Sequence, residues 1–219
     1  MAILKNGLFG TFSGKVGNII GYEYKGQQCI RRMPAKSKKQ PSPAMAEQQK
    51  KFAFAAGFIK TLSPLLNSLP DKKRLSCARS TLAQGRIIRS CLLAEGDVYR
   101  INYERVLLCE GKDCTISVSF CASPSAISFS CSPSFRNVYA LMEAYVLVWL
   151  PQDGRWLWQT AVFRNGLAGG SILVPRLSTE TSAETYVICL LQGGKVSASR
   201  YTGQLIIPAS LSSELTTCH

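Results

Sequence analysis

The sequence predicts an α+β protein, in which a glycine-rich β-hairpin arm and a helical pair precede an antiparallel β-sandwich. Three patterns in the 219 residues predict this fold class. Glycines are interspersed with β-branched and aromatic residues near the amino terminus, apolar residues then recur at helical spacing, and short runs with strand periodicity fill the rest. We expect four segments: an arm at 1–33, a basic linker at 34–43, a helical segment at 44–94 and the sandwich domain at 95–219.

The arm reads NGLFGTFSGKVGNIIGYEYKGQQCIRR over residues 6–32. Its residue types favour strands, so we predict a twisted hairpin or ribbon that turns near Lys25-Gly26. A two-stranded hairpin is marginal in water, and we therefore expect it to dock, either on its own domain or on a neighbouring molecule. The glycine spacing matches neither a phosphate loop nor a dinucleotide fingerprint. The apolar residues expected to pair with another copy are Val16, Ile19, Ile20, Tyr22, Tyr24 and Ile30.

Positive charge is concentrated in the first part of the chain. Residues 1–90 hold 17 Lys and Arg against three acidic residues, a formal charge of +14, whereas the remainder holds nine against ten. Such an imbalance indicates contact with a polyanion or an acidic neighbour, although basic residues also simply keep a segment soluble. The linker, PAKSKKQPSP, contributes three lysines. The residues expected to contact nucleic acid are Arg31, Arg32, Lys36, Lys38, Lys39, Lys50 and Lys51.

A helix should follow the linker, because Ser42-Pro43 supplies an N-cap and a first-turn proline. Its apolar stripe should face a partner helix or sheet, and Pro64 should kink or end it near Ser63. A second helix is predicted from Asp71 to about Ala94, with a strand from Arg86 to Leu93 as the alternative. The stripe consists of Met45, Phe52, Ala55, Ile59, Leu62, Leu66 and Leu69.

The pattern changes to strand periodicity after Gly96, with hairpin turns at 151–154 and at Gly193-Gly194. Strands at this spacing are typical of an antiparallel sandwich or barrel. We expect Trp149, Trp156 and Trp158 to pack in its core. The predicted strands are Tyr103–Glu110, Cys114–Cys121, Ala126–Cys131, Tyr139–Leu150, Arg155–Arg164, Ser171–Val174, Thr185–Leu191 and Lys195–Ile207.

The order of these motifs resembles a family of unassigned function that is common in Bacteroidota genomes. The resemblance is carried by LKNGLFGTFSGKVGNIIGYEYKG, IRRMP, AMAEQQKKFAFAAGFIKTL, YERVLLCEG, AVFRNG and KVSASRYTGQLII. One departure is Tyr24, where that family usually has tryptophan after the glycine hairpin. The resemblance implies a β-sandwich preceded by a glycine hairpin and helices, and it implies no activity or catalytic residue.

Residues for catalysis are scarce. The nine cysteines are odd in number and follow no secretion signal, so we expect free thiols, and the Cys109–Cys114 spacing is too wide for a zinc knuckle. The sole histidine is His219, and two acidic pairs, Glu95 with Asp97 and Glu110 with Asp113, adjoin turn glycines, where carboxylates usually face solvent. We therefore expect no catalytic residue, cofactor or metal site.

No apolar run approaches the length that spans a bilayer, because the longest extends only over 144–150. The amino terminus also lacks the pattern of a signal peptide. We expect cytoplasmic synthesis without membrane insertion.

Two functions fit these features. The first is a non-enzymatic structural subunit that assembles with copies of itself, and with other structural subunits where the assembly has them, into a particle or filament such as a virion or a phage-derived tail-like component. Its arm would pair with a neighbouring subunit. The alternative is sequence-independent binding of nucleic acid by the basic segment.

Overall fold

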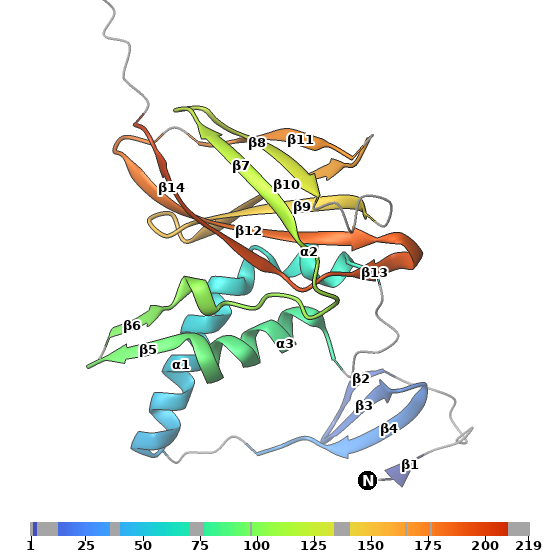
Figure 1. Ribbon diagram of the computed structural model, residues 1–219. Coiled ribbons are helices and arrows are strands. Elements are labelled where there is room, and N and C mark those ends of the chain that lie inside the picture. The colour runs from blue at the N-terminus through green and yellow to red at the C-terminus, as the bar shows by residue number, and fades with distance from the viewer. Residues whose placement is uncertain are drawn as a thin grey trace, which may run out of the picture. The chain divides into compact units, whose positions relative to one another are not determined.

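The computed structural model describes residues 2–3, 13–35, 40–70, 77–96, 98–133, 141–164, 166–175 and 177–209. The chain forms two compact units, Met1–Ser42 and Pro43–His219. The predicted fold class is confirmed, since an amino-terminal hairpin sheet, helices and antiparallel sheets all occur in the expected order (Figure 1).

The first unit is a four-stranded antiparallel sheet with the order β1 (Ala2–Ile3), β4 (Gln27–Arg32), β3 (Ile19–Tyr24) and β2 (Gly14–Val16). Its β3–β4 turn lies at Lys25-Gly26, as predicted. Both residues have positive φ, 52° and 74°, which is the conformation of a type I′ hairpin turn. Of the residues described in this unit, only Gly21 and Cys29 are buried.

The second unit begins with two helices separated by a break at the predicted place. Helix α1 (Pro43–Lys60) ends before a short turn, and α2 (Ser63–Ser68) starts again with Pro64 in its first turn. The second half of the predicted stripe is buried, but Met45 and Phe52 are 55% and 58% exposed. Those two residues remain more than half exposed, because the buried residues of α1 all lie in its last two turns.

The predicted second helix is too long. Helix α3 (Arg79–Arg86) continues as a π-helical turn at Ile87–Cys91 and then changes to strand β5 (Leu92–Glu95), which pairs with β6 (Val98–Ile101). Gly96 has φ 64° at the turn of this hairpin, a conformation that glycine adopts without steric cost. The alternative strand starts several residues too early, and residues 71–76 lie outside the described chain.

Two sheets form the sandwich. The larger sheet has the order β10 (Arg155–Val162), β9 (Leu141–Leu150) and β12 (Thr181–Leu191), and the outer edge of β12 pairs with both β13 (Lys195–Val196) and β14 (Arg200–Ile207). The smaller sheet has the order β11 (Ala168–Leu173), β8 (Ala126–Pro133) and β7 (Ile116–Ala122).

The predicted strand Tyr103–Glu110 is wrong. Tyr103–Arg105 forms a 3₁₀ turn, and the residues after it are extended without belonging to a sheet. Burial alternates over residues 106–108, since Val106 and Leu108 are buried and Leu107 is only half-buried, but Cys109 is buried as well. However, the backbone N–H groups of Leu108 and Cys109 donate to Ser199 Oγ, at 2.7 and 3.3 Å, instead of to a neighbouring strand.

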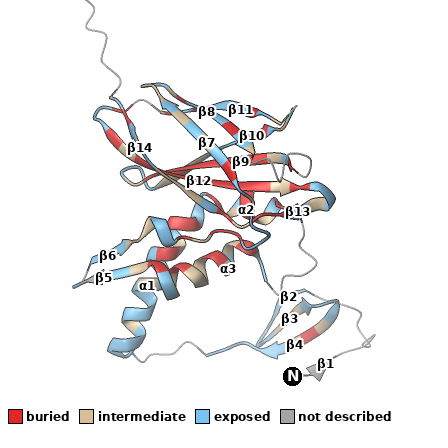
Figure 2. Ribbon diagram, viewed as in Figure 1, coloured by how far each residue is buried: buried red, intermediate tan, exposed pale blue. Residues whose placement is uncertain are grey.

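The larger sheet is covered on both faces (Figures 1 and 2). Residues Leu147 and Trp149 of β9 pack toward the helices, whereas Val146 and Val148 pack toward the smaller sheet. This alternation explains why nearly all of β9 and β12 is buried. Trp149 and Trp156 are buried as predicted, but they lie in the core between the larger sheet and the helices and not inside the sandwich. Trp158 is 38% exposed, so its predicted burial is wrong.

Candidate assembly and polyanion-binding surfaces

The strand register divides the six predicted pairing residues between the two faces of the arm. Val16 lies opposite Ile19, Ile19 opposite Arg32, and Gly21 opposite Ile30, and residues that lie opposite each other share a face. We call Val16, Ile19 and Ile30 the aliphatic face. The remaining three residues, Ile20, Tyr22 and Tyr24, lie on the other face, which we call the aromatic face.

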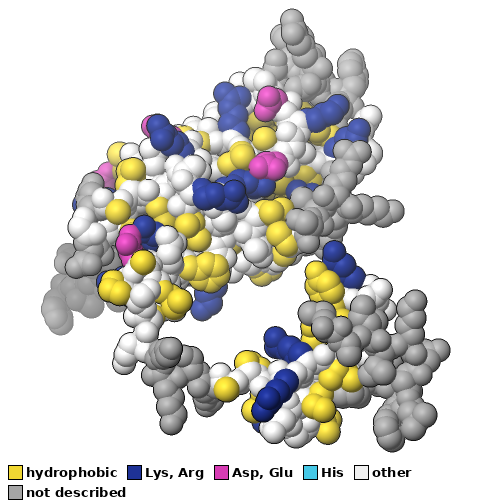
Figure 3. Space-filling view, turned by 90° about the horizontal axis from the view of Figure 1, so that it is seen from below, with side chains coloured by type: hydrophobic (Ala, Val, Ile, Leu, Met, Phe, Trp, Pro, Cys, Tyr) yellow, Lys and Arg dark blue, Asp and Glu magenta, His cyan; other side chains and the backbone are white. Residues whose placement is uncertain are grey.

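The aliphatic face is poorly covered. Val16 is 64% exposed and Ile19 46% exposed, and hydrophobic side chains are visible on the surface of the arm in Figure 3. Val16 also belongs to β2, the last strand in the sheet order, so the outer edge of β2 pairs with no strand of the described chain. An exposed sheet edge beside apolar side chains is a template for strand addition.

The aromatic face combines tyrosines with positive charge. The guanidinium of Arg31 lies 5.6 Å from the centre of the Tyr22 ring, and Lys25 Nζ lies 5.5 Å from that of Tyr24. Lys15 and Arg31 both lie opposite Ile20, one on each side. Sequence reasoning missed Lys15, although the period of two along the hairpin would have placed it on this face.

The structure does not bring all the predicted basic residues together. Arg31 and Arg32 are adjacent in β4 and therefore point to opposite faces of the sheet. Lys50 and Lys51 belong to α1 in the second unit. Lys36, Lys38 and Lys39 lie outside the described residues.

Lys51 is already engaged by an acidic neighbour. Its Nζ lies 2.6 Å from Glu47 Oε1, one helical turn away. Hydrogen bonding to Lys51 lowers the pKa of Glu47, and the same contact raises the pKa of Lys51. Both groups therefore stay charged at neutral pH, and Glu47 neutralises part of the helix's positive charge locally.

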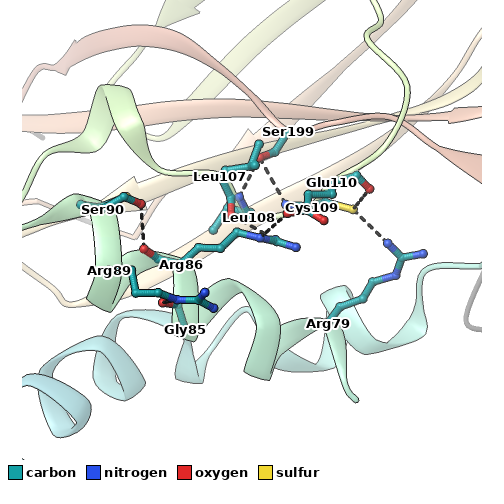
Figure 4. A network of polar contacts seen from close by, with 11 residues as sticks. Arg79, Gly85, Arg86, Arg89, Ser90, Leu107, Leu108, Cys109, Glu110 and Ser199 are labelled. Atoms are coloured by element: carbon teal, nitrogen blue, oxygen red, sulfur yellow. Dashed lines mark hydrogen bonds and ion pairs between the residues drawn. The ribbon is translucent and has the colours of Figure 1, made fainter. Parts of the chain in front are cut away.

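A buried network around Cys109 is the strongest candidate for chemistry in the second unit (Figure 4). Arg79 is only 6% exposed and donates from Nη1 to Cys109 Sγ, at 3.1 Å, and from Nη2 to the Pro70 carbonyl, at 2.6 Å. Burial raises the pKa of the Cys109 thiol, and the Arg79 charge offsets this only in part. Cys109 therefore remains a thiol at neutral pH, not the thiolate that a nucleophile requires.

The acidic residues near Cys109 do not supply a base. Glu110 forms an ion pair with Arg86, with Oε1 2.8 Å from Nε, and its side chain is largely exposed. Asp113 is exposed as well, as expected for a carboxylate at a turn. The network thus ties α3 to the 106–110 segment.

The described side chains form no candidate metal site. Within these parts of the chain no three His, Cys, Asp or Glu residues gather as a metal would require. Glu95 and Asp97, the other predicted pair, have side chains outside the described set.

Comparison of the chain with models of protein families, and with curated proteins, finds no match. No helix in the described segments combines the length and the apolar character needed to cross a bilayer.

Proposed function

We propose that this protein is a non-enzymatic structural subunit, whose arm joins it to a neighbouring copy in a particle or filament. The observation that carries this proposal is the exposure of Val16 and Ile19 beside the outer edge of β2. A sheet with two buried residues in its described part gains little hydrophobic stabilisation of its own. Covering the aliphatic face with a second copy would supply the missing burial.

Strand addition suits a repeating assembly, because each copy carries an apolar face and an edge of β2 that pairs with no strand of the described chain. A virion or a phage-derived tail-like component is the kind of assembly that we propose. Such subunits are made in the cytoplasm and need no catalytic machinery. The protonated state of Cys109 and the engaged state of Glu110 support a role other than catalysis.

The substitution Ile19→Lys tests the aliphatic face. Because Ile19 is half exposed, lysine fits the single chain, but its charge would be buried in an interface. We expect the wild-type chain to sediment as an assembly and Ile19→Lys to sediment at 24.0 kDa, the mass of one chain.

The matched control is Gln27→Lys, which adds the same charge to the aromatic face. This variant should assemble like the wild type. Equal masses for wild type and Ile19→Lys, or a wild-type chain that sediments alone, would contradict the proposal.

A second candidate function, binding of nucleic acid, is favoured by the aromatic face. Lys15 and Arg31 lie there with Tyr22 and Tyr24, and base stacking on aromatic rings combined with phosphate contacts is typical of proteins that bind single strands without sequence preference. This function is compatible with assembly, because it uses the opposite face of the arm.

Adjacent arginines provide the test. We expect Arg31→Gln to weaken binding of single-stranded DNA and to lower the salt dependence of log K by about 0.7 per lost phosphate contact. Arg32→Gln removes the same charge from the opposite face and should have a smaller effect. Titrations across salt concentrations measure both. Equal losses for the two variants would show that net charge, and not the aromatic face, drives binding.

A further inference from the structure

Three of the described cysteines lie in the core between the two sheets of the sandwich. Cys131 in β8 and Cys189 in β12 are buried there, and Cys114 packs against the same cluster of side chains. Cys114 comes two residues before β7, the first strand of the smaller sheet along the chain. Of these three cysteines, only Cys114 is partly exposed to solvent.

Cys114 and Cys189 are in direct contact, because their side chains form a hydrogen bond to each other. Ser197 holds the two segments together. It pairs with Lys112, two residues before Cys114, and its backbone N–H donates to the Cys189 carbonyl at 2.8 Å. The Cys189 N–H donates in turn to Ser197 Oγ, also at 2.8 Å. The two sulfurs therefore need only approach from hydrogen-bonding distance to the length of a disulfide bond, about 2.05 Å.

The hydrogen bond makes the two thiols chemically different. It lowers the pKa of Cys114, and this effect exceeds the opposing effect of burial. The same bond, together with burial, raises the pKa of Cys189. Cys114 is thus the thiol that becomes a thiolate more readily, whereas Cys189 keeps its proton and donates it. Cys109 differs from Cys114, because burial raises its pKa.

We propose that Cys114 is a site of oxidation by hydroperoxides, and that Cys189 converts the oxidised side chain into a disulfide within the chain. A partly accessible thiol that readily ionises, with a second thiol beside it, is the usual arrangement of redox-sensing cysteines. Because both cysteines belong to the second unit, this chemistry would be independent of assembly through the arm.

The reaction has two steps, with hydrogen peroxide as the oxidant. In the first, the Cys114 sulfur attacks one peroxide oxygen and the O–O bond breaks, so that a thiol and a peroxide become a sulfenic acid and water. In the second, the Cys189 sulfur attacks the Cys114 sulfur and the S–O bond breaks. The departing hydroxide takes the Cys189 proton and leaves as water. A dithiol reductant returns both cysteines to thiols.

The disulfide would join the segment before β7 to strand β12, and so connect the smaller sheet covalently to the larger one. A crosslink between residues far apart in sequence restricts the unfolded chain. Oxidation should therefore raise the urea midpoint of the protein, and reduction should restore the original midpoint.

Peptide mass spectrometry of the full chain tests the proposal. The chain is fully reduced, treated with hydrogen peroxide, alkylated and digested without reductant. We expect a linked pair of peptides that contain Cys114 and Cys189, and we expect dithiothreitol to separate them. Cys114 should also react several-fold faster than Cys121, because the hydrogen bond from Cys189 favours the thiolate. Cys121 is the more exposed thiol, so accessibility alone would give the opposite order.

Two serine variants separate the roles of the neighbouring cysteines. In Cys189→Ser the second step cannot occur, so Cys114 should accumulate as the sulfenic acid, which dimedone captures. Cys131→Ser is the matched control, because it changes another buried cysteine of the same core. This variant should form the Cys114–Cys189 link as the wild type does.

Three results would overturn the proposal. One is a wild-type chain in which Cys114 reacts more slowly than Cys121. Another is oxidised Cys114 without a link to Cys189, or with an equally abundant link to Cys131. The third is the same amount of dimedone adduct at Cys114 in the wild type and in folded Cys189→Ser. The first two results come from the wild-type chain, so they decide the proposal even where a variant does not fold.

Discussion

Gly111 is the glycine, among those described, at which an added Cβ would meet the backbone most closely. A Cβ at this position would overlap the Val196 carbonyl oxygen and lie 2.8 Å from its carbonyl carbon. The close approach lets Lys112 pair with Ser197 and lets the Ala198 N–H donate to the Lys112 carbonyl at 3.0 Å. Because the obstacle is backbone, no side-chain rotation relieves it.

Two glycine-to-alanine variants should therefore shift stability in opposite directions. Gly111→Ala should lower the free energy of unfolding by about 1–3 kcal/mol or more, the usual cost of overpacking. Gly57→Ala adds the same methyl group to an open helical position and should raise that free energy by up to about 1 kcal/mol. Urea unfolding measures both, and a loss of equal size at the two positions would contradict the close approach at Gly111.

Local chemistry was the most predictable part of the structure. The Lys25-Gly26 turn and the restart of the helix at Pro64 follow from the conformations of glycine and proline, which depend on few neighbours. The polar partners of Cys109 were not predictable, since Arg79 and Ser199 are 30 and 90 residues away. The division of the arm into two faces was predictable only in part. It depends on the register between strands, but these strands are close together in the sequence.

At the scale of elements, the periodicity of the sequence predicted many of the apolar residues that are buried, but it did not predict which elements pack against them. The alternation over residues 106–108 is the same for a strand in a sheet and for an extended segment on a sheet face, and the structure has the second. The π-helical turn at Ile87–Cys91 likewise has no distinctive sequence pattern, although such turns frequently accompany a change of structure or function.

Helix α1 shows how an element can belong to two environments. Its last turns bury Ala55, Phe58 and Ile59 in the core, whereas its first turns carry exposed Met45 and Phe52. A single sequence stripe therefore continues from the interior onto the surface. An aromatic pocket lined by Phe54, Phe58, Tyr103 and Trp149 lies beside the point where this change occurs, with Phe58 buried in its wall and Phe54 exposed there. No pattern in the sequence indicates the pocket, because its walls come from three separate elements.

At the scale of the molecule, the larger sheet connects two cores. One core lies between this sheet and the helices, and the other lies between it and the smaller sheet. Adjacent residues of β9 and β12 contribute to opposite cores, so a loss of packing on one side loosens the strands that support the other. The helices and the sandwich should therefore unfold together, even though the sequence changes character near residue 95.

The variant Leu62→Ala tests this coupling. Leu62 is fully buried among the helices, and its truncation should lower the free energy of unfolding by about 2–5 kcal/mol. The helices are followed by circular dichroism, and the opposite core by alkylation of Cys131 in β8, located by peptide mass spectrometry. Burial raises the pKa of the Cys131 thiol to about 11, so this thiol reacts slowly until its core opens.

If the two cores form one cooperative unit, both signals should move to the same lower urea midpoint in Leu62→Ala. Leu173→Ala removes the same atoms from a side chain that is 79% exposed. By either signal, this variant should change the free energy of unfolding by no more than about 0.5 kcal/mol. A variant in which circular dichroism shifts while Cys131 keeps its wild-type midpoint would show instead that the helices open separately. In that case the larger sheet would be a boundary between two independently folding layers, and not the element that joins them.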